Sequence, residues 1–127
     1  MSKIIIKSEN APAPIGPYSQ AVKAGPFLFV SGQVALHPVT GQMENADIET
    51  ETKQVLHNID SILNEAGYTW QEVVKSTIFL KDMNDFGTVN GLYATFFTEN
   101  PPARETVEVA RLPKEARVEI SVVAFQN

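Results

Sequence analysis

One long amphipathic helix is predicted among short apolar segments that have the period of strands, and this alternation limits the possible folds more than any other feature. Between Ile48 and Ala66 the apolar residues recur at steps of three and four, as they do on one face of a helix. They are Val55, Leu56, Ile59, Ile62, Leu63 and Ala66. Asp47 has the side chain of an N-cap, and Gly67 can adopt the left-handed conformation that ends a helix. The spacing therefore predicts a helix over 48–66 that packs through one face.

The other apolar segments have the alternation and the β-branched content of strands. We predict strands at Lys3–Lys7, Ala21–Ala24, Phe27–Ser31, Val73–Lys81, Ala103–Ala110 and Arg117–Phe125. Gly25-Pro26 forms the turn of a hairpin between the second strand and the third, and the proline-rich segment 10–20 before them is an extended loop. A second helix is predicted from Phe86 to Phe97, because its apolar residues again have helical spacing and Pro101-Pro102 stops it.

Strands and helices in this order predict an α+β fold with one mixed sheet. The short connection Arg111–Ala116 predicts that the last two strands are antiparallel neighbours. Two amphipathic helices cover one face of such a sheet, and the other face keeps an apolar or mixed set of side chains. This set includes Val73, Thr77, Phe79, Val123 and Phe125. We therefore expect a homo-oligomer in which another copy covers this face.

Length and charge narrow the classes of function. With 127 residues and a mass of 14.0 kDa, the chain is predicted to form a single domain, 1–127. The net charge of −5 disfavours nucleic-acid binding, because a phosphate-binding surface is basic. The first residues do not resemble a signal peptide, and no apolar run approaches the length of a membrane span. We expect a cytoplasmic protein that binds neither nucleic acid nor membrane.

The residues that metal and covalent chemistry use are scarce in this chain. It contains no Cys, which excludes disulfides, thiolate nucleophiles and cysteine metal sites. Of its two histidines, His37 lies in a predicted turn and His57 on the polar side of the first helix, so neither is placed for a zinc site or a Ser-His-Asp triad. The glycines form no phosphate-binding motif. We therefore expect no metal and no cofactor.

The closing strands carry the best candidates for a functional site. The period of two puts Arg104 and Thr106 on one face of their strand. We expect Val107 and Val109 on the other face, in the core with the apolar residues of the last strand. Arg104 and Glu119 then share the face opposite the core, on adjacent strands. This arrangement is either an ordinary ion pair, worth under about 1 kcal/mol when exposed, or a site where Arg104 binds a small carboxylate.

Four motifs occur in a characteristic order. They are Gly16-Pro17-Tyr18-Ser19-Gln20-Ala21, Phe29-Val30-Ser31-Gly32-Gln33, Phe86-Gly87-Thr88-Val89-Asn90, and Pro102-Ala103-Arg104 followed by Val107-Glu108-Val109-Ala110-Arg111-Leu112-Pro113-Lys114. Together they resemble the reactive-intermediate deaminase family, known as RidA or YjgF. The resemblance implies a chorismate-mutase-like α+β fold whose two helices pack on one face of the sheet. It also implies a homotrimer with a central β-barrel and with active sites between neighbouring subunits.

The resemblance implies an enzyme that hydrolyses 2-imino acids, or their enamine tautomers, to 2-keto acids and ammonia without a metal or cofactor. The implied substrates are 2-iminobutanoate and 2-iminopropanoate, which arise when pyridoxal-phosphate dehydratases act on threonine or serine, so the role is metabolite damage control. The alternative is a non-catalytic trimer that binds small keto acids as a regulatory or chaperone-like module. Chorismate mutase activity is disfavoured because a shared fold does not imply shared chemistry, and nuclease activity because the chain is acidic.

The resemblance also assigns roles to individual residues. Arg104 corresponds to the arginine that binds the substrate carboxylate, and Glu119 corresponds to the acid that orients the attacking water. Thr106, where many relatives have Cys, corresponds to a position that contacts the imino group through its backbone. The positions that line the cleft correspond to Tyr18, Ser31, Gly32 and Asn90. Without the resemblance, these last four residues have ordinary structural explanations, such as anchoring a loop or starting a turn.

Overall fold

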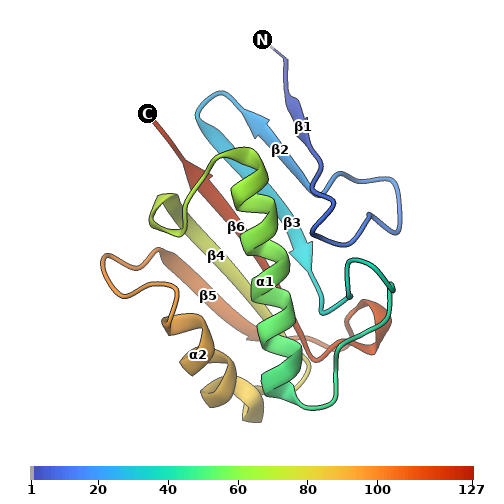
Figure 1. Ribbon diagram of the computed structural model, residues 1–127. Helices are drawn as coiled ribbons and strands as arrows, with labels where there is room; N and C mark the ends of the chain where they lie inside the picture. The colour runs from blue at the N-terminus through green and yellow to red at the C-terminus, as the bar shows by residue number, and fades with distance from the viewer. Residues whose placement is uncertain (1) are drawn as a thin grey trace.

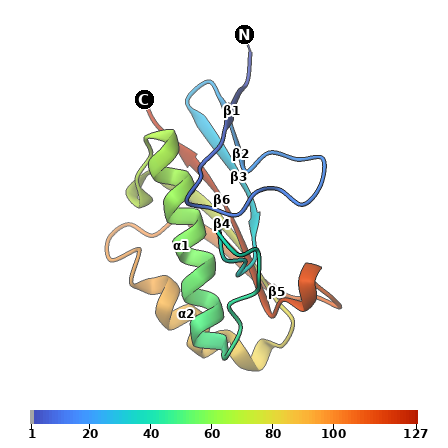
Figure 2. The same cartoon turned by 45° about the vertical axis from the view of Figure 1, so that its right-hand side comes forward.

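The computed structural model describes residues 2–127. A six-stranded mixed sheet forms one layer, and two helices pack against one of its faces (Figure 1; Figure 2). The strands are β1 (Ile4–Ile6), β2 (Ala21–Ala24), β3 (Phe27–Gln33), β4 (Val73–Leu80), β5 (Ala103–Glu108) and β6 (Val118–Phe125). The helices are α1 (Ile48–Ala66) and α2 (Phe86–Ala94). The predicted α+β class and the placement of both helices on one face are confirmed.

Helix α1 has the bounds and the caps that its sequence predicts. The Asp47 carboxylate accepts a hydrogen bond from the Thr50 N–H at 2.7 Å, and Gly67 ends the helix with a φ of 78°. The predicted apolar face lies in the core, with exposures of at most 1% for Val55, Leu56, Ile59, Ile62 and Leu63. Burial of each of these side chains contributes about 1.5–3 kcal/mol, so packing on the sheet, more than helix propensity, stabilises α1.

Helix α2 is shorter than its sequence predicts. It ends at Ala94, whereas the apolar spacing continues to Phe97. Beyond its end, Phe96 and Phe97 pack on Trp70 with ring centroids 4.6 and 5.4 Å apart. The spacing of these two rings therefore reflects an aromatic cluster with a distant part of the chain, and not a further helical turn.

The strand order, β1-β2-β3-β6-β4-β5, contradicts one prediction. β5 and β6 are not antiparallel neighbours, because β4 lies between them, parallel to β5 and antiparallel to β6. The segment 109–117 crosses the end of β4, where the Val109 N–H donates to the Leu80 carbonyl at 2.8 Å and the Lys81 N–H donates to the Arg117 carbonyl at 2.9 Å. Neighbouring strands lie about 4.8 Å apart, so a connection of this length spans an intervening strand. The length of this connection limits how far apart β5 and β6 can lie, but it does not determine which strands pair.

The register of the sheet decides which side chains face the helices. Ser76, Ile78 and Leu80 of β4 are buried on the helix side, with exposures of at most 1%. A register shift between Val73 and Lys75 also turns Val73 into the core, where it is 4% exposed. The prediction that Val73 lies on the outer face is therefore wrong, because an irregularity in the ladder interrupts the alternation on which it depended.

The face of the sheet away from the helices remains open and largely apolar. The predicted outer residues Thr77, Phe79, Val123 and Phe125 lie on this open face. It also carries Phe29, which is 48% exposed, and Val107, which is 42% exposed. Among residues 2–127, no helix is long and apolar enough to cross a membrane.

Candidate active site

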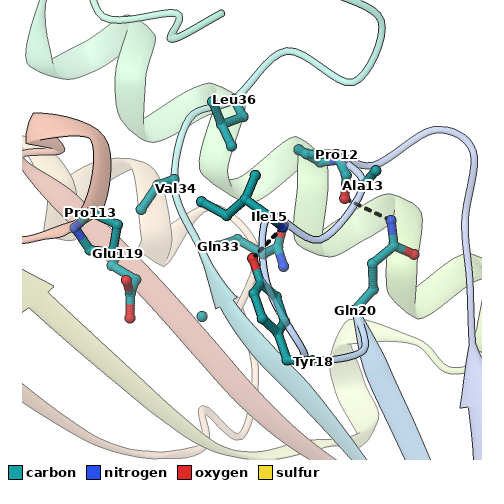
Figure 3. A pocket seen from close by; sticks show the side chains of 11 residues that line it. Pro12, Ala13, Ile15, Tyr18, Gln20, Gln33, Val34, Leu36, Pro113 and Glu119 are labelled. Atoms are coloured by element: carbon teal, nitrogen blue, oxygen red, sulfur yellow. Dashed lines mark hydrogen bonds between the residues drawn. The ribbon is translucent and has the colours of Figure 1, made fainter. Parts of the chain in front are cut away.

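Glu119 of β6 lies on the open side of the sheet, in the pocket shown in Figure 3. We call this the Glu119 pocket, and Tyr18, Gly32, Gln33 and Pro113 contribute to its lining. The carboxyl group is half-buried, and this burial raises its pKa above the usual range for Glu. Within residues 2–127 it forms no salt bridge. A carboxylate in this state is a stronger proton acceptor than an exposed one.

Gly32 of β3 leaves the space that the Glu119 carboxylate occupies. A Cβ atom at position 32 would overlap one carboxylate oxygen and would lie 2.8 Å from the carboxyl carbon, closer than real Cβ atoms approach other atoms. The preceding Ser31 is held by the backbone, since its hydroxyl donates to the Ser19 carbonyl at 2.6 Å. The register of β3 also shifts between Val30 and Gln33. Position 32 therefore controls where Glu119 lies.

Tyr18 lies on the proline-rich loop, whose shape depends on Gln20. The buried Gln20 amide donates to the carbonyls of Ser8 at 3.0 Å and Pro12 at 2.8 Å, and it accepts from the Ser8 N–H at 2.6 Å. Prolines remove N–H donors from this loop, so the Gln20 side chain supplies hydrogen bonds that regular structure would otherwise make. The Tyr18 ring is 47% exposed and lies at the Glu119 pocket, as Figure 3 shows.

Arg104 of the edge strand β5 faces the helix side, toward α2. Its guanidinium donates to Asn90 Oδ1 at 2.7 Å. Its Cζ atom lies 5.1 Å from the centre of the Tyr93 ring and 5.6 Å from the centre of the Phe86 ring. A hollow of about 370 Å³ adjoins it, lined in part by Pro102. No carboxylate among the described residues pairs with this half-buried cation, so its other N–H donors remain for an anion.

Thr106 follows Arg104 on the same side of β5, in register with Ile78. Its hydroxyl oxygen is buried and has no hydrogen-bond partner among residues 2–127. Its backbone lies at the free edge of the sheet. The Val109 N–H points toward β4, where it donates to the Leu80 carbonyl. Alternate residues of a strand direct their N–H and C=O groups to opposite sides, so residue 106, three positions before Val109, directs its groups away from β4. The carbonyl of Thr106 therefore points away from β4, where it is placed to accept a hydrogen bond from a ligand.

The predicted site residues thus form two groups, one around Arg104 and one around Glu119, on opposite sides of the sheet. This corrects the prediction that these two side chains share a face on adjacent strands. Arg104 is in register with Ser76, which is buried on the helix side, whereas Glu119 is in register with Phe79 and Val107 on the open face. The prediction failed because it placed the valines of β5 in the core. Within one chain, Arg104 and Glu119 form neither an ion pair nor a common pocket.

His37 and Glu108 accept hydrogen bonds from backbone N–H groups, and His57 is exposed. Nδ1 of His37 accepts hydrogen bonds from the N–H groups of Val39 and Thr40, at 3.1 and 3.3 Å, within the predicted turn. His57 is exposed on α1, and Glu108 accepts a hydrogen bond from a backbone N–H at 2.8 Å. Residues 2–127 contain no group of three or more side chains placed to hold a metal ion.

Of the residues that hold Arg104, the sequence identifies Asn90 but not the others. Phe86 and Tyr93 belong to the predicted apolar face of the second helix, and Ser76 is an unremarkable strand residue in the pattern. In the structure the Tyr93 hydroxyl donates to Ser76 Oγ at 2.9 Å, and both residues are buried. The feature of the sequence that could have revealed this contact is a Ser among the core-facing positions of β4, because a buried hydroxyl needs a hydrogen-bond partner.

Comparison with known proteins agrees with the motifs. The model of the family described as Endoribonuclease L-PSP matches residues 8–126. A RutC family protein of Pyrococcus horikoshii is 53% identical over 125 residues, covering 98% of this chain and 99% of the relative. The 2-iminobutanoate/2-iminopropanoate deaminase of Escherichia coli K12 is 48% identical over 130 residues, covering 100% of both. The crystal structure of the E. coli YjgF gene product is 45% identical, with a TM-score of 0.92 and coverage of 98% of this chain and 99% of that one. By sequence and by fold, the chain belongs to the YjgF/RidA family.

Proposed function

We propose that this protein hydrolyses 2-imino acids, such as 2-iminobutanoate and 2-iminopropanoate, to 2-keto acids and ammonia. Relatives from mouse and E. coli whose names state this activity are 49% and 48% identical to it. One observation carries the proposal: the chain presents a half-buried guanidinium and a half-buried carboxylate, Arg104 and Glu119, and neither has a partner of opposite charge among residues 2–127. Hydrolysis of a small anionic imine needs an anchor for its carboxylate and a base for water.

A complete site of this kind takes Arg104 from one copy and Glu119 from another. We infer a homotrimer in which the open faces of three sheets form a central β-barrel, with each site between neighbours. The open face supports this assembly, since Phe27, Phe29 and Val107 are between 40% and 48% exposed there and a second copy would bury them. The position of Arg104 on the free edge of the sheet also leaves it accessible to a neighbour.

The chemistry follows from the groups that each copy presents. Arg104 binds the substrate carboxylate with the N–H donors that Asn90 does not use, and the Thr106 carbonyl accepts a hydrogen bond from the protonated imine nitrogen. A water oxygen attacks the imine carbon while Glu119 accepts a proton from that water. Glu119 then returns the proton to the nitrogen and the C–N bond breaks. The ammonia leaves with the hydroxyl proton as ammonium, and the 2-keto acid remains.

The test couples the protein to a threonine dehydratase and measures 2-ketobutyrate release above the spontaneous rate. We expect the wild-type protein to accelerate release, and Arg104→Ala and Glu119→Gln to leave only the spontaneous rate. Arg111→Ala is the matched control, because this arginine side chain is 84% exposed, and it should retain activity. Equal traces for wild type and Arg104→Ala would refute the deaminase proposal. In that case calorimetric titration with 2-ketobutyrate would test the alternative, a non-catalytic module that binds keto acids.

A further inference from the structure

Three side chains contact the guanidinium of Arg104, and a fourth, Ser76, is hydrogen-bonded to one of the three. The proposed chemistry assigns a substrate contact to none of these four side chains. We call them the Arg104 cluster: Ser76 of β4 and Phe86, Asn90 and Tyr93 of α2. Asn90 holds one N–H group at 2.7 Å, and the two aromatic rings lie 5.1 and 5.6 Å from Cζ. The face of an aromatic ring attracts a guanidinium and restricts its plane. Without such contacts, an arginine side chain keeps much rotamer freedom, which it loses when it is ordered.

The Tyr93 ring is itself fixed in place. It is 5% exposed, and its hydroxyl donates to Ser76 Oγ at 2.9 Å, where Ser76 is 0% exposed. On another side the ring packs against Phe97 with centroids 4.7 Å apart. Rotation of the ring away from Arg104 would therefore leave a buried hydroxyl of Ser76 without a partner and would disrupt the aromatic packing. A phenylalanine would make the same contact with Arg104 but could not be locked in this way.

We propose that Tyr93 is a positioning residue of the proposed deaminase site. Its ring, locked by Ser76, sets the plane of the Arg104 guanidinium before substrate arrives. The carboxylate of a 2-imino acid then meets N–H donors that are already ordered, so less conformational freedom is lost on binding. The identity of the ligand rests on the proposed function, whereas the order of the guanidinium rests on the contacts of the Arg104 cluster alone.

Binding of the product 2-ketobutyrate, measured by calorimetry, tests the consequence for the ligand. We expect Tyr93→Leu to bind about tenfold more weakly than wild type, because the cation–π contact and the fixed plane are both lost. Tyr93→Phe, which keeps the ring but loses the hydrogen bond to Ser76, should recover only part of the affinity. Phe96→Leu is the matched control, since it removes a neighbouring ring that packs on Trp70. In an Arg104→Ala background, Tyr93→Leu should cause no further loss.

Nuclear magnetic resonance of the Arg104 side chain tests the positioning without reference to any activity. In the wild-type protein without ligand, we expect separate Nη signals from slow rotation about the Nε–Cζ bond, and we expect Tyr93→Leu to average them. Averaged signals in the wild-type protein would overturn the proposal even if Tyr93→Leu failed to fold. Unchanged affinity in Tyr93→Leu, or an equal loss in Phe96→Leu, would also overturn it. If Arg104→Ala bound 2-ketobutyrate as wild type does, the proposed function would fail, while the Nη signals would still decide the positioning role.

Discussion

Two inactive variants are expected to restore activity when they assemble together. Arg104→Ala removes the carboxylate anchor from each copy, and Glu119→Gln removes the base. Because these groups face opposite sides of the sheet, each site of the proposed trimer takes one of them from each of two neighbours. If the proposed trimer forms, one of the three sites in each mixed trimer combines an intact Arg104 with an intact Glu119. Random assembly at equal amounts makes about three quarters of the trimers mixed, so about one quarter of all sites are active.

The assay is 2-ketobutyrate release after the two variants are unfolded, mixed and refolded together. A mixture of wild type with the double variant Arg104→Ala, Glu119→Gln is the matched control, and it should also have about one quarter of the wild-type activity. Sites contained within one chain would give no activity in the first mixture and about half of the wild-type activity in the second. That result would refute the division of the site between copies. The two variants mixed after separate folding, without subunit exchange, should remain inactive.

Four further predictions follow from single contacts. Arg104→Lys keeps the charge but loses the planar fork, so it should lose most of the turnover; near wild-type rates would contradict the anchoring role. The raised pKa of Glu119 predicts that kcat/KM falls, as pH decreases, at a pH above the ordinary Glu value of about 4.3. A kcat/KM that stays level down to that value would contradict the role of Glu119 as the base. Gly32→Ala should displace the Glu119 carboxylate and reduce turnover while the melting temperature stays near that of wild type; unchanged turnover would show that the displacement does not matter. Thr106→Val removes a buried hydroxyl that has no partner among residues 2–127, so urea unfolding should show a gain of about 1 kcal/mol, with activity retained because the proposed contact is the carbonyl. A loss of activity in Thr106→Val would mean that the hydroxyl itself participates.

The charge of the chain argues against the nuclease activity that the family's description states. Endoribonuclease L-PSP names a nuclease, yet the chain has a net charge of −5, the wrong sign for a surface that binds phosphates. The cation of the candidate site, Arg104, is half-buried and stacked on aromatic rings, which suits a single small carboxylate. Incubation of the protein with RNA is therefore expected to leave the RNA intact, and cleavage abolished by Arg104→Ala would contradict this interpretation.

The local structure of this protein was determined by the sequence. Helix α1 begins after Asp47 and ends before Gly67 because the capping hydrogen bond and the left-handed glycine depend only on neighbouring residues. The hairpin of β2 and β3 follows likewise from its Gly25-Pro26 turn. The four motifs, one of which contains Arg104, are also local, so the family and the candidate residues could be recognised without a structure.

Tertiary structure decided where those residues lie relative to one another. The alternation of β5 places its side chains in two sets on opposite faces. No feature of the neighbouring sequence determines whether the set with Arg104 or the set with Val107 faces the helices. The insertion of β4 between β5 and β6, together with the rings of α2 that pack around the guanidinium, placed Arg104 on the helix side. A period of two specifies that neighbouring residues face opposite ways, but only contacts between distant segments determine which way is inward.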